Sequence, residues 1–191
     1  MADYQFETSK VIEKAKKYNP RIIGLQFPDG LKIHALKLAQ KLEKELGVTV
    51  LISADPCYGA CDVADTKLEG IVDLLIHYGH SPLPLDYGIP VIFVEAYAKV
   101  DIIPVLRSSL KLLSGYYKVG VATTTQHLHL LGEAIKFLED HGKKVLSAKG
   151  VGTRRGQVLG CNFSSVKGLD VDVYLFIGSG DFHPLGIRSV S

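Results

Sequence analysis

Two segments of the chain, residues 21–85 and 118–185, follow one plan of strand and helix patterns. Val72-Asp73 in the first segment matches Val171-Asp172 in the second, and each segment ends with a Pro-Leu pair. This duplication predicts two related domains, because each copy has its own strand-length apolar runs and its own helical pattern. It also predicts equivalent loops, so residues far apart in the sequence could serve one site.

The first segment begins with an apolar run over residues 21–27, which is typical of a strand. A helix over residues 31–46 is expected next, since the apolar residues there recur at helical spacing. Asp29 is its expected N-cap, and Gly47 is its expected stop. A short helix near residues 64–70 and strands over 48–53 and 72–77 complete the segment.

The second segment repeats this order, with a strand over residues 118–123 and a helix over 126–140. Strands over 144–148 and 171–177 complete it. The stretch between the two segments contributes one more strand and one more helix, at residues 90–94 and 100–113.

Consecutive strands that are joined by helices pair in parallel, with right-handed crossovers. We therefore expect an α/β fold made of two related, small parallel-sheet βαβ domains. Residues 1–115 are expected to form the first domain with its linker, and residues 116–191 the second.

The composition argues against several classes of protein. The 191 residues are 47% apolar, which suits one large or two small globular domains. The net charge of +2 has its signs mixed along the chain, so nucleic acid is not an expected partner. The apolar runs are about strand length, and the N-terminus lacks the pattern of a signal peptide. We therefore expect a cytoplasmic protein with no membrane segment.

The three cysteines are the best indication of chemistry. An odd number of thiols in a cytoplasmic protein argues against a disulfide framework. Cys61 and Cys161 lie in matching polar, glycine-rich loops after strands, where thiolates would suit an iron–sulfur or zinc centre. Cys57 and Cys61 have the spacing that begins the radical S-adenosylmethionine motif Cys-x-x-x-Cys-x-x-Cys, but Ala64 occupies the third position. Cys57 is a less favoured ligand, because buried cysteines are common as small apolar side chains.

Ligands of open parallel sheets bind beyond the carboxyl ends of the strands. We therefore expect a site in a cleft between the two domains. Its candidate residues at strand ends or helix starts are Gly79, His80, Gln126, Gly178, Ser179, Gly180 and His183. The glycines would allow close backbone approach to a nucleoside or amino-acid group, although turns alone would also explain them. A glutamine at a helix start could offer its side-chain amide and backbone N–H to a carboxylate.

Other polar residues near the same strand ends have simpler explanations. His77, His127 and His129 are more readily explained as structural hydrogen-bonding residues than as ligands. Lys149, Arg154 and Arg155 form a basic loop before Cys161, for which a solvated surface is the simpler explanation. Contact with a carboxylate or with an acidic protein face is the functional alternative for this loop.

Five longer stretches carry a specific resemblance. They are Tyr58–Asp62 with Ala64-Asp65, then Asp73–Ser81, Thr123–His129, Gly156–Asn162 and Phe176–Gly186. In this order they resemble the diphthamide-synthesis 3-amino-3-carboxypropyltransferases, a non-canonical radical S-adenosylmethionine family. The resemblance covers nearly the whole chain.

The resemblance implies a fold of three related domains, each giving one cysteine to a [4Fe–4S] cluster. Cys61 and Cys161 match the first two of these cysteines. Three thiolates leave one iron open for S-adenosylmethionine, and the reduced cluster cleaves the bond from its sulfur to the methionine γ-carbon. The resulting 3-amino-3-carboxypropyl group goes to an imidazole carbon of one histidine in translation elongation factor 2. This is the first step of diphthamide synthesis.

The resemblance also implies an external reductant and a homodimer, as in archaeal members. The candidate strand-end residues would then contact S-adenosylmethionine. A third domain with its cysteine has no counterpart in these residues, so we expect a truncated form of the enzyme. Cys57 would be a less favoured substitute for the third ligand.

Two other functions stay open from the sequence. One is a structural zinc-binding or thiol-redox domain that uses Cys57 and Cys61. The other is a non-catalytic partner subunit that binds S-adenosylmethionine or a catalytic homologue.

Overall fold

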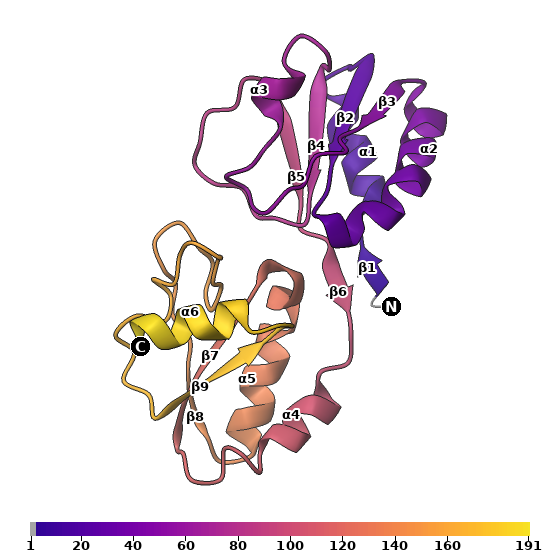
Figure 1. Cartoon of the computed structure of the whole chain (residues 1–191). Coiled ribbons are helices and arrows are strands. Elements are labelled where there is room, and N and C mark those ends of the chain that lie inside the picture. The colour runs from indigo at the N-terminus through magenta and orange to yellow at the C-terminus, as the bar shows by residue number, and fades with distance from the viewer. Residues whose placement is uncertain (1–2) are drawn as a thin grey trace. The chain divides into compact units, whose positions relative to one another are not determined.

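The structure is a computed structural model that describes residues 3–191. The chain divides into two compact units (Figure 1). Residues 5–96 form the first unit, and residues 97–191 form the second together with Asp3 and Tyr4. Each unit contains its own parallel sheet.

The first unit is built on the strands β2 (Ile22–Gln26), β3 (Thr49–Ile52), β4 (Leu74–Tyr78) and β5 (Val91–Val94). They form a four-stranded parallel sheet in the order β3-β2-β4-β5. The strand β4 is buried along its whole length, as expected of an inner strand in a parallel sheet. The helices are α1 (Thr8–Lys16), α2 (Ala35–Leu46) and α3 (Asp65–Leu68), and the 3₁₀ helix η1 (Asp29–His34) leads into α2.

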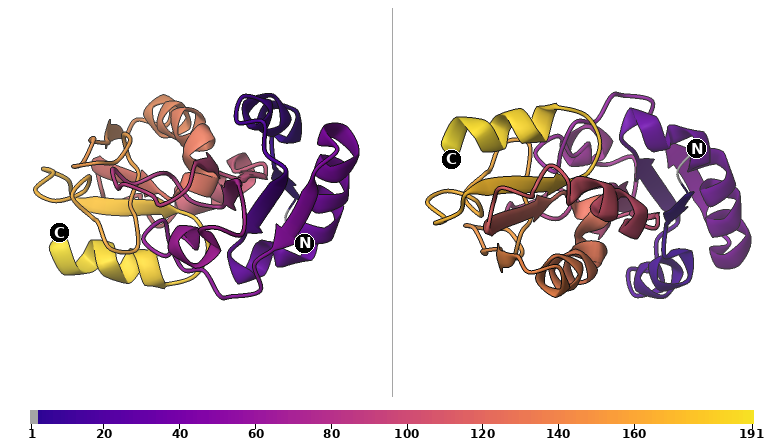
Figure 2. Two further views of the ribbon diagram at one scale, coloured as in Figure 1. Left: turned by 90° about the horizontal axis from the view of Figure 1, so that it is seen from above. Right: turned by 90° about the horizontal axis from the view of Figure 1, so that it is seen from below.

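The second unit repeats this plan on a smaller sheet. The strands β7 (Lys118–Thr123), β8 (Lys144–Leu146) and β9 (Val173–Ile177) pair in parallel in the order β8-β7-β9. The helices are α4 (Ile103–Ser109), α5 (Leu131–Asp140) and α6 (Phe182–Val190), and the 3₁₀ helix η2 (Thr125–Leu130) leads into α5. In both views of Figure 2, α6 runs alongside β9. The short strands β1 (Asp3–Gln5) and β6 (Tyr97–Lys99) form a separate two-stranded sheet.

The α/β class with parallel sheets, predicted from the sequence, is confirmed by this architecture. The longest helix that the structure describes is α2, with 12 residues. Within residues 3–191, no helix combines the length and the apolar character needed to cross a membrane.

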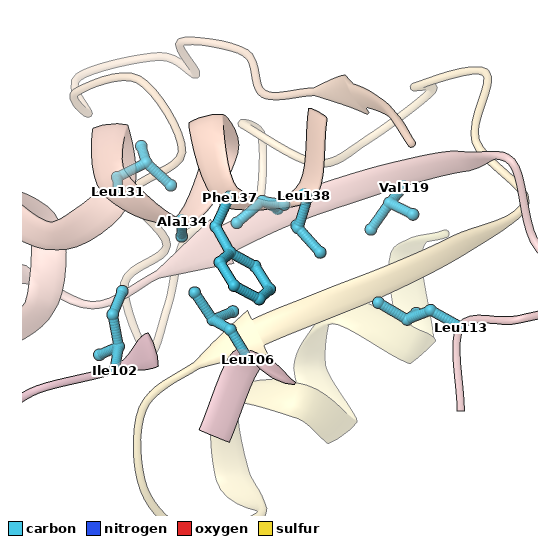
Figure 3. Packing of buried hydrophobic residues seen from close by; sticks show 9 residues of the cluster. Ile102, Leu106, Leu113, Val119, Leu131, Ala134, Phe137 and Leu138 are labelled. Carbon is cyan, nitrogen blue, oxygen red and sulfur yellow. The ribbon is translucent and has the colours of Figure 1, made fainter. Parts of the chain in front are cut away.

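The core of the second unit includes the segment that precedes β7. Leu106 and Leu113 from this segment pack with Val119 of β7 and Leu138 of α5 (Figure 3). The first domain with its linker was expected to extend to residue 115, but residues 97–115 belong to the second unit, where Ile102, Leu106 and Leu113 are buried in the core. A helical pattern does not specify which unit the helix packs on. The packing of these side chains therefore sets the boundary between the units.

The duplicated Val-Asp pair has the same role in both units. Asp73 Oδ2 accepts hydrogen bonds from the backbone N–H groups of residues 21 and 22, at 2.7 and 2.9 Å. Asp172 Oδ2 accepts from the N–H groups of residues 117 and 118, at 2.9 and 2.7 Å. In each unit, one carboxylate therefore satisfies the backbone at the start of the first strand of the sheet.

Several local features differ from the sequence expectations. The prediction that Asp29 caps its helix is wrong, because no side chain caps this end and the cap position belongs to Pro28. Asp29 is instead the first residue of η1 and forms an ion pair with Lys32 at 2.6 Å. Gly47 is confirmed as the stop of α2, with a φ of 67° that favours glycine. The elements β1, α1, β6 and α6 were not predicted.

The packing in Figure 3 predicts a strong effect of one core substitution. Leu138 is fully buried, so Leu138→Ala should lower the free energy of unfolding by about 2–5 kcal/mol through lost burial and a cavity. Chemical denaturation followed by circular dichroism measures this loss. Leu112→Ala is the matched control, since that side chain is 80% exposed, and its loss should be small. Equal losses in the two variants would contradict the described core.

The paired aspartates predict a dependence of stability on pH. Hydrogen bonds from Ile22 and Arg21 lower the pKa of Asp73, and those from Lys118 and Tyr117 lower the pKa of Asp172. A carboxyl whose pKa is lowered by folding stabilises the protein above its unfolded pKa, and this contribution is lost as the pH falls through the folded pKa.

Asp73→Asn and Asp172→Asn should therefore lower the melting temperature at neutral pH and reduce its further fall between about pH 5 and 2. Melting curves measured across this range test the prediction. Asp140→Asn is the control, because Asp140 is an exposed carboxylate at the C-terminal end of α5. A similar effect of this control would contradict a specific role for the duplicated aspartates.

Candidate functional site

The loop that carries Cys61 is attached to the first sheet by a buried amide. Gln26, the last residue of β2, is 2% exposed. Its Nε2 donates to the carbonyl oxygen of Asp62 at 2.8 Å, and its Oε1 accepts from the backbone N–H of Ala64 at 3.0 Å. The segment that follows Cys61 is therefore held at the carboxyl end of the central strands.

The two cysteines of this loop lie in different environments. Cys61 is exposed, and a Cβ on residue 59 would lie 3.2 Å from its sulfur, so Gly59 leaves room beside the thiol. Cys57 is buried, with its sulfur 3.7 Å from the carbonyl oxygens of Gly59 and Asp62. Burial is the main cause that raises the pKa of Cys57 to about 11. Of these two thiols, only Cys61 is openly available.

His77 and His80 form a hydrogen-bonded pair next to this loop. His77 Nδ1 lies 2.8 Å from Gln26 Oε1, and His77 Nε2 lies 2.9 Å from His80 Nδ1. The Gln26 oxygen is identified by the Ala64 N–H that it accepts, so His77 Nδ1 must carry the proton. His77 Nε2 then accepts from His80 Nδ1–H. Burial lowers the pKa of His77 to about 3 and that of His80 to about 4, so both rings are neutral at physiological pH.

Gly79 makes the turn between the two histidines. Its φ of +86° is one that glycine adopts readily. A Cβ there would lie 2.7 Å from Pro28 Cγ, so the position also lacks space for a side chain. The turn and this close approach explain why a glycine occurs at the end of β4.

The loop that carries Cys161 is attached in a similar way. Gln157 is 2% exposed; its Nε2 donates to Thr125 Oγ1 at 2.6 Å, and its Oε1 accepts from the N–H of Arg154 at 3.0 Å. Cys161 itself is exposed. A Cβ on the preceding residue, Gly160, would lie 3.0 Å from the ring of Phe182. The Cys161 loop therefore packs on the start of α6 and leaves its thiol open.

The two arginines of the basic loop have partners within the second unit. Arg154 Nη1 donates to the hydroxyl of Tyr97 at 3.3 Å, and Arg155 Nε donates to the carbonyl of Ser147 at 3.0 Å. Both arginines remain exposed. These contacts give the basic loop a structural role and leave its proposed contact with a carboxylate untested.

Of the candidate residues after β9, the Gly178-Ser179-Gly180 turn is exposed and His183 is half-buried. Gly178, Ser179 and Gly180 follow the strand, and Gly180 has a φ of +71°. His183 lies in the first turn of α6, where its ring stacks on Phe176 with centroids 5.7 Å apart. Burial lowers the pKa of His183. Backbone and imidazole groups are thus available at this strand end.

The remaining candidates lie in and around η2. Gln126 is half-buried in the first turn of this 3₁₀ helix. The ring of His129 packs on Tyr97 with centroids 4.9 Å apart. His127 Nδ1 is buried and, within residues 3–191, has no hydrogen-bond partner. Burial lowers the pKa of His127, which favours the neutral ring.

Gln26 and Gln157 were not predicted to be site residues. Both are buried polar residues: Gln26 ends β2 and holds the Cys61 loop, whereas Gln157 lies within the Cys161 loop and contacts Thr125 of η2. A glutamine at the end of an apolar strand, such as Gln26, is a sequence signal for a buried polar contact. The sequence does not identify its partners, because they come from a segment far along the chain. The meeting of Cys61 and Cys161 at one centre stays a prediction.

The model of the diphthamide synthesis protein family matches residues 27–190. The chain belongs to this family. The family resemblance inferred from the sequence motifs is thereby confirmed. The 2-(3-amino-3-carboxypropyl)histidine synthase of Pyrococcus horikoshii is 40% identical over 189 residues, which cover 96% of this chain and 54% of that protein. Subunit 1 of the corresponding synthase of Saccharomyces cerevisiae is 31% identical, over 95% of this chain and 44% of that protein.

Solved structures agree with this assignment. The crystal structure of Dph2 from Pyrococcus horikoshii matches with a TM-score of 0.90 and 37% identity, over 98% of this chain and 56% of that chain. A second crystal structure of that protein, with a 4Fe-4S cluster, matches to the same extent. The chain thus spans about half the length of the relatives and structures that it matches.

The different environments of the cysteines predict different rates of alkylation. At pH 8 the exposed thiols of Cys61 and Cys161 should react first with iodoacetamide. Cys57 should react at least about 100-fold more slowly, because it is buried and its raised pKa leaves little reactive thiolate. Mass spectrometry of quenched samples measures the rates, and fragment ions separate Cys57 from Cys61. Denatured protein is the control, in which the difference should largely disappear.

Proposed function

We propose that this chain acts in the first step of diphthamide synthesis. The reaction transfers a 3-amino-3-carboxypropyl group from S-adenosylmethionine to an imidazole carbon of one histidine in translation elongation factor 2. The observation that carries the proposal is the match of 98% of the chain to a protein whose crystal structure contains a 4Fe-4S cluster. Two relatives with the same synthase name, at 40% and 32% identity, support it.

Cys61 and Cys161 are the residues that would hold the [4Fe–4S] cluster. Both thiols are exposed on loops, and Gly59 leaves open space beside Cys61. Thiolates are the ordinary protein ligands of such clusters, so these residues fit the group. A third thiolate would come from outside residues 1–191, with the buried Cys57 as the weaker alternative. When bound, the cluster supplies the electron that cleaves the sulfur–carbon bond of S-adenosylmethionine.

The strand-end residues would bind and orient S-adenosylmethionine. Gly178, Ser179 and Gly180 offer exposed backbone at the end of β9, where parallel sheets bind ligands. His80 donates through Nδ1 to His77, so its Nε2 could accept a hydrogen bond from the cofactor. His183, Gln126 and Gly79 complete the proposed set. Their neutral or backbone groups would position the cofactor without adding charge.

The proposed partners follow from the reaction. Translation elongation factor 2 is the protein substrate, and an external reductant supplies electrons. A homodimer in the cytoplasm is the expected form, without nucleic acid or membrane.

The thiol-redox alternative has less support in the geometry. A redox pair needs a reactive thiolate, but burial raises the pKa of Cys57 to about 11. The burial and raised pKa of Cys57 therefore disfavour the formation of a disulfide with Cys61. A non-catalytic subunit role is the remaining alternative, and labelled transfer to elongation factor 2 would separate it from catalysis.

Anaerobic reconstitution with iron and sulfide tests the proposed cluster ligands. Cys61→Ser and Cys161→Ser should each lower the bound iron and the visible absorbance strongly, since each removes one thiolate. Iron and sulfide analysis, with electron paramagnetic resonance after reduction, measures the effect. Cys57→Ser is the matched control and should keep its iron. A full-length relative that is reconstituted in parallel is the positive control. The assignment would be contradicted if this relative bound iron and the 191-residue chain did not. It would also be contradicted if Cys61→Ser and Cys161→Ser bound as much iron as the parent chain.

Activity is tested with labelled S-adenosylmethionine, dithionite and elongation factor 2. The 191-residue chain should be compared with a form extended to the full length of its relatives. Label on the factor in either form supports catalysis by this family member. Its absence from both forms, with intact clusters, would favour the non-catalytic role.

A further inference from the structure

The first unit brings together three metal-ligating side chains outside the proposed cluster ligands. They are Cys57, His77 and His80, and one ligand atom from each lies within 4.8 Å of the others. Cys57 and His77 are buried, and His80 is half-buried. All three belong to residues 5–96, so the group needs nothing from the second unit.

The sheet topology explains why these residues meet. The loop of Cys57 follows β3, and His77 lies near the carboxyl end of β4. Both strands pair in parallel with β2, so their carboxyl ends lie at the same edge of the sheet. The turn at Gly79 brings the ring of His80 back to that of His77, with centroids 5.1 Å apart.

A hydrogen bond from His77 to Gln26 orients the imidazole ring in the way that is typical of metal-binding histidines. Histidines that bind metals commonly donate their other ring N–H to an acceptor that fixes the ring and its tautomer. Gln26 Oε1 is this acceptor for His77 Nδ1–H, at 2.8 Å. The Gln26 amide is itself fixed by the backbone of Asp62 and Ala64. The backbone therefore keeps the Nε2 lone pair of His77 directed at the group.

We propose that Cys57, His77 and His80 form a mononuclear site for a zinc-like divalent cation, separate from the thiols of Cys61 and Cys161. One cysteine and two histidines are a ligand set that suits zinc, and three protein ligands leave the fourth tetrahedral position open. The site uses neither of the cluster cysteines, so it does not depend on the proposed cluster. It shares His80 with the proposed cofactor set, and with the cation bound the Nε2–H of His80 would donate to the cofactor instead of accepting from it.

Binding is balanced in protons and requires the three side chains to approach a tetrahedral arrangement. The thiol of Cys57 loses one proton to solvent, and its thiolate sulfur binds the cation. His77 binds through Nε2 and keeps its Nδ1 proton, while His80 moves its proton from Nδ1 to Nε2 and binds through Nδ1. For a tetrahedral centre, bond lengths of about 2.3 Å to sulfur and 2.1 Å to nitrogen place the ligand atoms roughly 3.4–3.6 Å apart. The ligand atoms lie within 4.8 Å of one another, so their separations would change by up to about 1 Å when the cation binds.

The site would stabilise the loop of Cys61. Cys57 precedes Cys61 in the loop, and Gln26 holds the segment after Cys61. A cation at Cys57 would attach the preceding side of the loop to β4 as well. A cation bound to Cys57, His77 and His80 would therefore help to fix the position of the Cys61 thiol without binding it.

Cobalt binding to the protein before reconstitution tests the proposal. Co²⁺ replaces zinc in such sites and gives a near-ultraviolet charge-transfer band when a thiolate binds it. The test uses the Cys61→Ser/Cys161→Ser double variant, in which Cys57 is the only thiol of the chain. This variant should bind one Co²⁺ per chain with that band, show the visible bands of four-coordinate cobalt, and release the Co²⁺ to Zn²⁺.

Loss of the proposed ligands supplies the contrast. Cys57→Ser should abolish the charge-transfer band and weaken Co²⁺ binding by at least about 100-fold, and His80→Ala should weaken it similarly. His141→Ala is the control, because His141 belongs to the second unit and bonds to the carbonyl of Phe137. Circular dichroism checks that each variant folds. A rise in melting temperature with Co²⁺ should appear in the double variant and in the control, but not in Cys57→Ser.

Two outcomes would overturn the proposal. One is the absence of a charge-transfer band in the double variant while it remains folded. The other is a Co²⁺ affinity and band of the double variant that survive the further change His80→Ala, which would place the cation away from the proposed ligands. Iron binding at the cluster ligands is measured separately, so failure of this site and failure of the proposed function give different results.

Discussion

The buried amide of Gln26 is the interaction on which the first unit's site depends. It joins the end of β2 to the segment after Cys61 and also holds the ring of His77. A buried polar group left without its partner costs about 1–3 kcal/mol, so these three contacts strongly favour a single arrangement. The open thiol of Cys61 and the tautomer of His77 are therefore set by the same side chain.

The two units show how a duplicated plan diverges. Asp73 and Asp172 keep identical contacts with the backbone at the start of a strand. The cysteine loops also keep a buried glutamine, but Gln157 comes from the loop itself, whereas Gln26 comes from a strand. The backbone contacts that define the sheet are thus retained, while the polar contacts at its carboxyl edge differ between the units.

Much of the fold could be predicted because its cause is local. Apolar spacing identified the strands of both sheets and the helices that became α2 and α5, and Gly47 ended α2 as expected. The N-cap role of Asp29 failed, since η1 precedes α2 and no side chain caps it. The association of residues 97–115 with the second unit could not be predicted either, because a helical pattern does not identify the surface on which the helix packs. Of the candidate site, the motifs singled out Cys61 and Cys161; both are exposed, and their role as cluster ligands stays a prediction.

The sequence by itself determined the duplication, the α/β class and the family, since these depend on periodicity and on motifs that are read along the chain. Only the tertiary structure decided that Cys57 is buried beside His77 and His80, and that Gln26 orients them. These residues come from separate strands and loops, and the pairing of β3 and β4 with β2 brings them to one edge of the sheet. Strand order is a property of the packed sheet, and no local pattern in the sequence encodes it.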